Sequence, residues 1–331
     1  MNSNTPLTSI EVSTSRPALI RIQASLFGIP LGLMGLSGAW GRMGFAHWAV
    51  SAPIADGLFV IALALLALLL CLWLAKWALY PQAVQQEWSH PVQGALMALI
   101  PVSLMLALTL MNMRWPSLSG WLFPMAISVL CLKAVMAWHV VADISMGKTL
   151  TEFITPALYL PIVPGGFVGA IALESFGLHG WAALLFGMGV GAWALLEIRI
   201  LHRLFSGPLP LALRPTLGLE MAPAAVGALS AVTLWPHLPP DAMMVILGVA
   251  SGPVLAVMTR WRYWTETPFS AGFWSFSFPI AALAGAVVHS VHTGGWPLEV
   301  ALVAVGISTA VTLFLTLRTA RLLFTGRLLG P

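Results

Sequence analysis

The charged residues of this chain are separated by long uncharged stretches, and the lengths of these stretches restrict the possible folds more than any other feature. Twenty uncharged residues lie between Arg21 and Arg42, and 22 lie between Glu174 and Glu197. A helix needs about 20 apolar residues to cross the roughly 30 Å of hydrocarbon in a bilayer. The strands of an outer-membrane barrel would instead give alternating segments of about 10 residues, a pattern that the sequence lacks. The spacing therefore predicts an all-α membrane protein that crosses the bilayer many times.

The composition excludes a soluble fold and gives no sign of an enzyme. Hydrophobic residues make up 59% of the 331 residues and charged residues only 8%, against about 25% charged in a typical soluble domain. A soluble fold could not cover that much apolar surface without large exposed patches. The sequence contains no phosphate-binding glycine motif and no recognisable set of nucleophile, base and orienting residue. We therefore expect no catalytic activity, no cofactor and no metal site.

The apolar stretches and the turn-forming residues between them predict ten transmembrane helices. They form one domain over residues 22–331, preceded by a short cytoplasmic segment of residues 1–21. No stretch is long or polar enough for a second, soluble domain. The expected helices cover residues 22–45, 55–79, 90–112, 118–142, 156–176, 180–204, 212–235, 241–262, 269–291 and 298–324.

The basic residues predict the orientation of the chain in the membrane. With the N-terminus in the cytoplasm, 12 of the 15 lysines and arginines fall on the cytoplasmic side. Arg42 and Arg114 fall outside, and Lys133 lies within the fourth helix. By the positive-inside rule, this distribution places both termini in the cytoplasm. The net charge of +4 then reflects topology, and no nucleic-acid partner is expected.

One proline lies near the middle or in the first half of each odd-numbered helix, at intervals of 56 to 71 residues. A proline within a helix removes a backbone hydrogen bond and bends the helix. In lipid, the orphaned carbonyl is best placed against protein or a water-filled cavity. This predicts five hairpins with quasi-five-fold symmetry, in which the kinked odd helices surround a central pore and the even helices lie outside. The alternative is that these prolines only reflect the general frequency of proline in membrane helices. The five are Pro30, Pro101, Pro164, Pro223 and Pro279.

The residue before each proline would occupy an equivalent height in a symmetric ring. Four of these residues are aliphatic, and Phe278 is the single aromatic one. A phenylalanine among smaller apolar residues could close a narrow pore, since hydrophobic constrictions gate channels by excluding water. The alternative is that Phe278 only packs between helices. The four predicted neighbours at the pore level are Ile29, Ile100, Val163 and Ala222.

Three strings of the odd-numbered helices are distinctive: FGIPLGLMGLSGAW in the first helix, TPALYLPIVPGGFVGA in the fifth and PFSAGFWSFSFP in the ninth. They resemble the TehA family of bacterial tellurite-resistance and C4-dicarboxylate transporters, to which the slow anion channels of plant guard cells are related. The resemblance runs from about residue 25 to the C-terminus. It implies a homotrimer in a bacterial inner membrane, in which each subunit has its own pore. The family's gating phenylalanine maps onto Phe278.

The resemblance favours a passive, gated channel for small monovalent anions, linked by family to tellurite resistance. The alternative is a proton-coupled transporter of dicarboxylate, sulfite or tellurium oxyanions, which needs a titratable group in the pathway. Glu220 is the candidate for that group, because an ionisable residue at membrane depth is a functional candidate by default. It could also be protonated, or structural and paired, for example with Arg214, and these interpretations are favoured because a carboxylate near an anion pore would oppose permeation. Lys133 is expected to pair with a neighbour, extend to the membrane surface or contact another subunit.

Overall fold

Ten helical spans long and apolar enough to cross a membrane are present in the computed structural model, which describes residues 17–46 and 48–329. Their limits lie within four residues of the predicted ones, and the described part of the chain contains no strand. The ten-helix prediction is therefore confirmed. Residues 1–16 of the predicted N-terminal segment lie outside the described range.

The odd-numbered spans are η1 (Ala24–Phe27), α1 (Gly28–Arg42) and η2 (Met43–Ala46); α4 (Pro91–Leu96) and α5 (Leu99–Arg114); η5 (Pro156–Tyr159) and α7 (Val163–Ser175); η6 (Leu211–Met221) and α9 (Ala222–Leu234); and η7 (Ala271–Phe276) and α12 (Ser277–Gly294). The even-numbered spans are α2 (Ser51–Leu79), η3 (Pro116–Leu118) with α6 (Ser119–Ser145), α8 (His179–Phe205), α10 (Pro240–Thr259) and α13 (Leu298–Phe324), and the connections contain α3 (Pro81–Ser89), η4 (Thr151–Phe153) and α11 (Trp261–Thr265).

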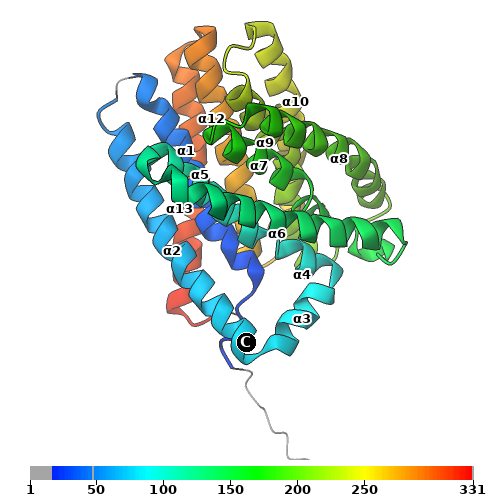
Figure 1. Cartoon of the computed structure of the whole chain (residues 1–331). Coiled ribbons are helices and arrows are strands. Elements are labelled where there is room, and N and C mark those ends of the chain that lie inside the picture. The colour runs from blue at the N-terminus through cyan, green and yellow to red at the C-terminus, as the bar shows by residue number, and fades with distance from the viewer. Residues whose placement is uncertain (1–16, 47, 330–331) are drawn as a thin grey trace, which may run out of the picture.

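The spans form an inner and an outer layer. In the odd-numbered spans, 67–94% of the residues in the most apolar stretch are buried, against 11–28% in the even-numbered spans. The inner helices contact one another in the order α1, α5, α7, α9, α12 and back to α1, and each outer helix packs on the inner helix that precedes it. Figure 1 shows α5, α7 and α9 in the middle of the molecule, with α2, α6 and α8 around them. The contacts thus close a ring of five inner helices, whereas the five-fold symmetry itself stays a prediction.

The outer helices present apolar side chains away from the ring. Trp121 and Trp138 of α6 and Leu195 of α8 are among the most exposed large hydrophobic residues, with 79%, 77% and 74% of their surface accessible. Such a surface is unstable in water but suits lipid, in which helices gain nothing by hiding apolar groups. The layers therefore agree with the membrane assignment made from the charge spacing.

The five recurring prolines lie at the starts of α-helices, which differs from the predicted kinks within helices. Pro164 and Pro223 are the second residues of α7 and α9, and Pro30, Pro101 and Pro279 are the third residues of α1, α5 and α12. The first amide groups of an α-helix have no partner within the helix, so proline costs little there. Four of the five α-helices are preceded by a 3-10 segment, and α5 is preceded by α4. Each inner span is therefore built from two pieces, and the proline marks the beginning of the second.

Lys133 of α6 lies in a slot on α7. Only 5% of Lys133 is exposed, and it forms no hydrogen bond or ion pair with any described residue. A Cβ atom added to Gly165 would lie 1.3 Å from Lys133 Cε and 2.0 Å from Nζ. A larger residue at position 165 would therefore displace the end of this lysine side chain. The expectation that Lys133 pairs with a neighbour or extends to the membrane surface is therefore wrong for this structure.

Lys76, near the end of α2, is equally buried but fully paired. Its Nζ atom donates hydrogen bonds to Glu87 Oε1 at 2.5 Å and to the Ile22 carbonyl oxygen at 2.6 Å. No part of the Lys76 side chain is exposed. These two contacts join the end of α2 to α3 and to the segment that leads into α1.

The two lysines allow a matched test of buried charge. Lys133→Met is expected to raise the midpoint of thermal unfolding in detergent, because the thioether fills a similar volume without an unpaired charge. Lys76→Met should lower the midpoint, because it leaves the Glu87 carboxylate without its partner at a cost of about 3 kcal/mol. Shifts of the same sign in both variants would contradict the different environments described for these lysines.

Candidate functional site

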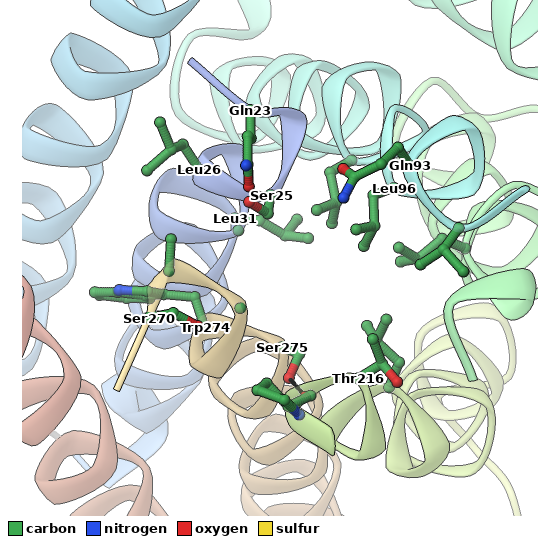
Figure 2. A pocket seen from close by; sticks show the side chains of 18 of the residues that line it. Gln23, Ser25, Leu26, Leu31, Gln93, Leu96, Thr216, Ser270, Trp274 and Ser275 are labelled. Carbon is green, nitrogen blue, oxygen red and sulfur yellow. Dashed lines mark hydrogen bonds between the residues drawn. The ribbon is translucent and has the colours of Figure 1, made fainter. Parts of the chain in front are cut away.

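A cavity of about 300 Å³ opens at one end of the helix ring, and all five inner spans line it. Figure 2 shows polar and apolar side chains from η1, α1, α4, η6 and η7 around an open space. The lining residues that lie furthest along the inner helices belong to the first turn of each α-helix. These are Leu31 of α1, Val102 of α5, Pro164 of α7, Ala222 of α9, and Phe278 and Pro279 of α12. The cavity therefore follows the segments that precede the five α-helices and ends where the α-helices begin.

Hydrogen-bond donors line the wide part of the cavity. The side chains of Gln23, Gln93, Ser25 and Ser270 form no hydrogen bond with the described residues, so their donors are available to a solute. Ser275 differs, because its hydroxyl donates to the Pro215 carbonyl oxygen at 2.6 Å. Figure 2 shows Gln23 and Gln93 on neighbouring sides of the opening. Primary amides and hydroxyls can donate to an anion without adding a charge of their own.

The charged groups of the cavity are of one sign. Arg21 and Arg327 line it, and none of the described residues that line it is acidic. Charges of one sign in a cleft with low-dielectric walls raise the local concentration of the opposite ion. The cavity is therefore suited to attract anions and to repel cations.

Phe278 lines this cavity at the first turn of α12, and its ring is packed against α1. Only 5% of Phe278 is exposed. A Cβ atom added to Gly35 would lie 2.8 Å from Cδ2 of the ring and 3.2 Å from Cβ of Ala281. Because Gly35 lacks a side chain, the ring can lie against the backbone of α1 and occupy the space between α12 and α1.

The other predicted positions do not all reach the cavity. Of the four predicted neighbours at the pore level, Ala222 lines it, whereas Ile29, Ile100 and Val163 do not. Of the five prolines, Pro164 and Pro279 line it, whereas Pro30, Pro101 and Pro223 do not. In α1 and α5, the lining residues are instead Gly28, Leu31, Leu99 and Val102, two before and one after each proline. One residue turns an α-helix by about 100°, so small differences in helix rotation change which residue faces the cavity.

Glu220 is a buried residue of η6 whose carboxylate is paired. Arg260, at the end of α10, donates from Nη2 to Oε1 at 2.8 Å and to Oε2 at 3.0 Å. The Glu220 side chain is 5% exposed and does not line the cavity. The suggested partner Arg214 is wrong, since Arg214 pairs with Glu266. The structure thus places Glu220 in the wall of the ring, bound to an outer helix.

The polar residues that line the cavity were not among the predicted site residues. Ser25, Thr216 and Ser275 lie four to seven positions before a recurring proline, and Gln93 lies eight positions before one. Polar residues placed repeatedly just before the recurring proline are a signal that could have identified them.

Comparison with known proteins supports a transport function. The SLAC1 family, described as voltage-dependent anion channel, matches residues 21–323. A Haemophilus influenzae protein named tellurite resistance protein TehA homolog is 30% identical over 80% of each chain. The guard cell S-type anion channel SLAC1 of Arabidopsis thaliana is 26% identical over 95% of this chain and 58% of its own length. An uncharacterized transporter of Methanocaldococcus jannaschii is 22% identical over 71% of this chain and 74% of its own.

Proposed function

Because this chain belongs to the SLAC1/TehA family of anion channels and transporters, we propose that it conducts small monovalent anions passively through its helix ring, with Phe278 as the gate. The observation that carries this proposal is the one-sided charge of the cavity. Arg21 and Arg327 line it, no described lining residue is acidic, and Phe278 lines it at the first turn of α12. A passive pore needs attraction at its mouth but no tight binding site along its length.

A phenylalanine ring can close such a pore without any charge. A permeating anion must keep part of its water or exchange it for protein donors. The donors of the cavity stop at the first turn of the α-helices, where Phe278 offers only carbon. Gly35 allows the ring to lie across the space between α12 and α1. Opening then requires rotation of the ring or movement of the start of α12 away from α1.

Ion flux measurements separate passive conduction from proton coupling. In a planar bilayer with a chloride gradient, a passive anion channel gives a current that reverses near the chloride equilibrium potential and ignores a pH gradient. A proton-coupled transporter of dicarboxylate, sulfite or tellurium oxyanions gives uptake into liposomes that follows the pH gradient. Glu220 remains the titratable candidate for coupling, and its pairing with Arg260 outside the cavity favours a structural role. Flux that depends on a pH gradient and shows no electrogenic anion current would overturn the channel proposal.

Family membership also motivates a proposal for the assembly and the location. We propose a homotrimer in a bacterial inner membrane, with one pore in each subunit and both termini in the cytoplasm. The cavity would then open toward the cytoplasm, because Arg21 and Arg327 lie at its mouth and basic residues concentrate on that side. A role in tellurite resistance is carried only by the name of the Haemophilus influenzae relative.

Gly35→Ala tests the contact that holds the proposed gate closed. The added Cβ would lie 2.8 Å from the Phe278 ring, so the ring must shift. We expect a higher anion current than in the parent protein, and a smaller increase than removal of the ring produces. Gly38→Ala is the matched control, because no atom lies within 4 Å of a Cβ at that position. Equal currents in Gly35→Ala, Gly38→Ala and the parent would exclude a closed state that depends on this contact.

A further inference from the structure

The guanidinium group of Arg42 crosses between inner helices at the end of the ring opposite the cavity. Arg42 is the last residue of α1, and its Nη2 atom donates to Thr233 Oγ1 of α9 at 2.9 Å. In the ring, α1 and α9 are separated by α12. A Cβ atom added to Gly285 of α12 would lie 3.6 Å from Arg42 Cδ and 3.7 Å from Nε. The side chain therefore passes over α12 at a glycine to reach α9.

Arg42, Thr233 and Gly285 lie on the inward-facing sides of α1, α9 and α12. Gly285 lies seven residues after Phe278, and Arg42 lies seven residues after Gly35, which contacts Phe278. Thr233 lies eleven residues after Ala222, which lines the cavity. Residues seven or eleven apart share one face of an α-helix. Arg42 is thus on the same side of the ring wall as Phe278, about 10 Å along the axis by the rise of 1.5 Å per residue.

Thr233 holds the guanidinium in one orientation. Its hydroxyl donates to the Leu229 carbonyl oxygen at 2.7 Å, so its oxygen is left to accept from Arg42. A guanidinium has five N–H donors, and the contact to Thr233 is the hydrogen bond that Arg42 makes within the described residues. The remaining donors are available to a ligand.

The charge of Arg42 is not compensated, in contrast to the other arginine on this side. Among the described residues, no carboxylate lies within 4.0 Å of Arg42, whereas Arg114 Nε binds Asp56 Oδ1 at 3.0 Å. A partly buried cation without a counter-ion in the protein favours an anion from solution, because an unpaired charge is costly away from water.

We propose that Arg42, oriented by Thr233 above Gly285, forms an anion-binding site at the outer end of the pore. This inference rests on the proposed function, since it makes Arg42 a second positively charged site for the permeating anion, after the arginines that line the cavity. The ligand is a small monovalent anion. A planar oxyanion such as nitrate fits better than chloride, because two of its oxygens can accept parallel N–H bonds from the guanidinium fork.

The test uses the full-length protein with the Phe278→Ala change, so that the current does not depend on gate opening. Arg42→Gln should lower the chloride-over-sodium permeability ratio, from the reversal potential, by about five-fold, which corresponds to about 1 kcal/mol at 25 °C. Arg42→Lys should keep this ratio and lower the preference for nitrate over chloride. Arg114→Gln is the control and should leave both ratios unchanged, because the Asp56 carboxylate that it leaves unpaired has a side chain that is 64% exposed and is screened by water and salt.

A second measurement does not require current. Sodium nitrate, compared with sodium gluconate at equal ionic strength, should raise the thermal unfolding midpoint of the parent protein and of Arg114→Gln, but not of Arg42→Gln. Absence of current in Phe278→Ala with a retained nitrate shift would sink the channel proposal and keep the site. Unchanged permeability ratios in Arg42→Gln, or an undiminished nitrate shift in that variant, would overturn the site itself.

Discussion

Replacing Phe278 with alanine is expected to raise the anion current several-fold relative to the parent protein. The ring lines the cavity and lies against Gly35 of α1, and we expect alanine at this position to leave an opening that ions and water can enter. A graded series sharpens the test, because current should fall in the order alanine, leucine, phenylalanine as the side chain fills more of the space. The measurement is single-channel or macroscopic current of the purified protein in a planar bilayer under a chloride or nitrate gradient.

Phe276→Ala is the matched control for Phe278→Ala. Phe276 lies two residues earlier, is 4% exposed and packs on the Trp264 ring with centroids 4.7 Å apart, but it does not line the cavity. Its truncation removes a similar amount of buried surface and should destabilise the fold without opening a path. Parent-like current in a correctly assembled Phe278→Ala protein would rule out the gate, and an equal gain in Phe276→Ala would point to general loosening.

Arg260→Gln is expected to destabilise the protein by about 3 kcal/mol, because it leaves the buried carboxylate of Glu220 without its partner. The Glu220 side chain is 5% exposed, whereas that of Arg260 is 36% exposed. The reverse change, Glu220→Gln, should therefore cost much less, since the remaining guanidinium can turn to solvent. The double variant with glutamine at both positions should recover most of the loss. Thermal unfolding midpoints of the parent and the three variants in one detergent give the complete cycle.

The same Glu220→Gln variant separates the two transport mechanisms. If the carboxylate only binds α10 to the ring, anion current persists in this variant at close to the parent level. Under the proton-coupled alternative, the substitution abolishes uptake driven by a pH gradient. A large loss of flux in Glu220→Gln, with an unchanged unfolding midpoint, would instead indicate that Glu220 takes a direct part in transport.

The ten spans could be predicted because the membrane sets their length, and the uncharged stretches report that length directly. The rotation of each helix about its own axis could not be predicted to the same accuracy. The inner helices are apolar on every side, so periodicity does not show which face is turned inward. Phe278 and Ala222 line the cavity, whereas Ile29, Ile100 and Val163 do not, and the common pore level of the five residues stays a prediction. A rotation of about 100° per residue separates a lining side chain from one that faces a neighbouring helix.

The side-chain contacts between different helices could not be predicted from the sequence either. Arg260 and Glu220 are 40 residues apart, and Arg42 and Thr233 are 191 residues apart. The sequence does not show which basic residue lies close to a given carboxylate in the fold. From the sequence alone, Arg214 is therefore as reasonable a partner for Glu220 as Arg260. Only the packing of α10 on α9 and η6 brings Arg260 to that carboxylate.

The fit of Lys133 against Gly165 also links the mutations that these two positions can accept. Because a Cβ at position 165 would lie 1.3 Å from Lys133 Cε, a larger residue there must push the end of the lysine side chain out of its buried slot. A shorter side chain at position 133 removes this barrier and makes the change at 165 nearly neutral. Homologous sequences should therefore show the two positions varying together.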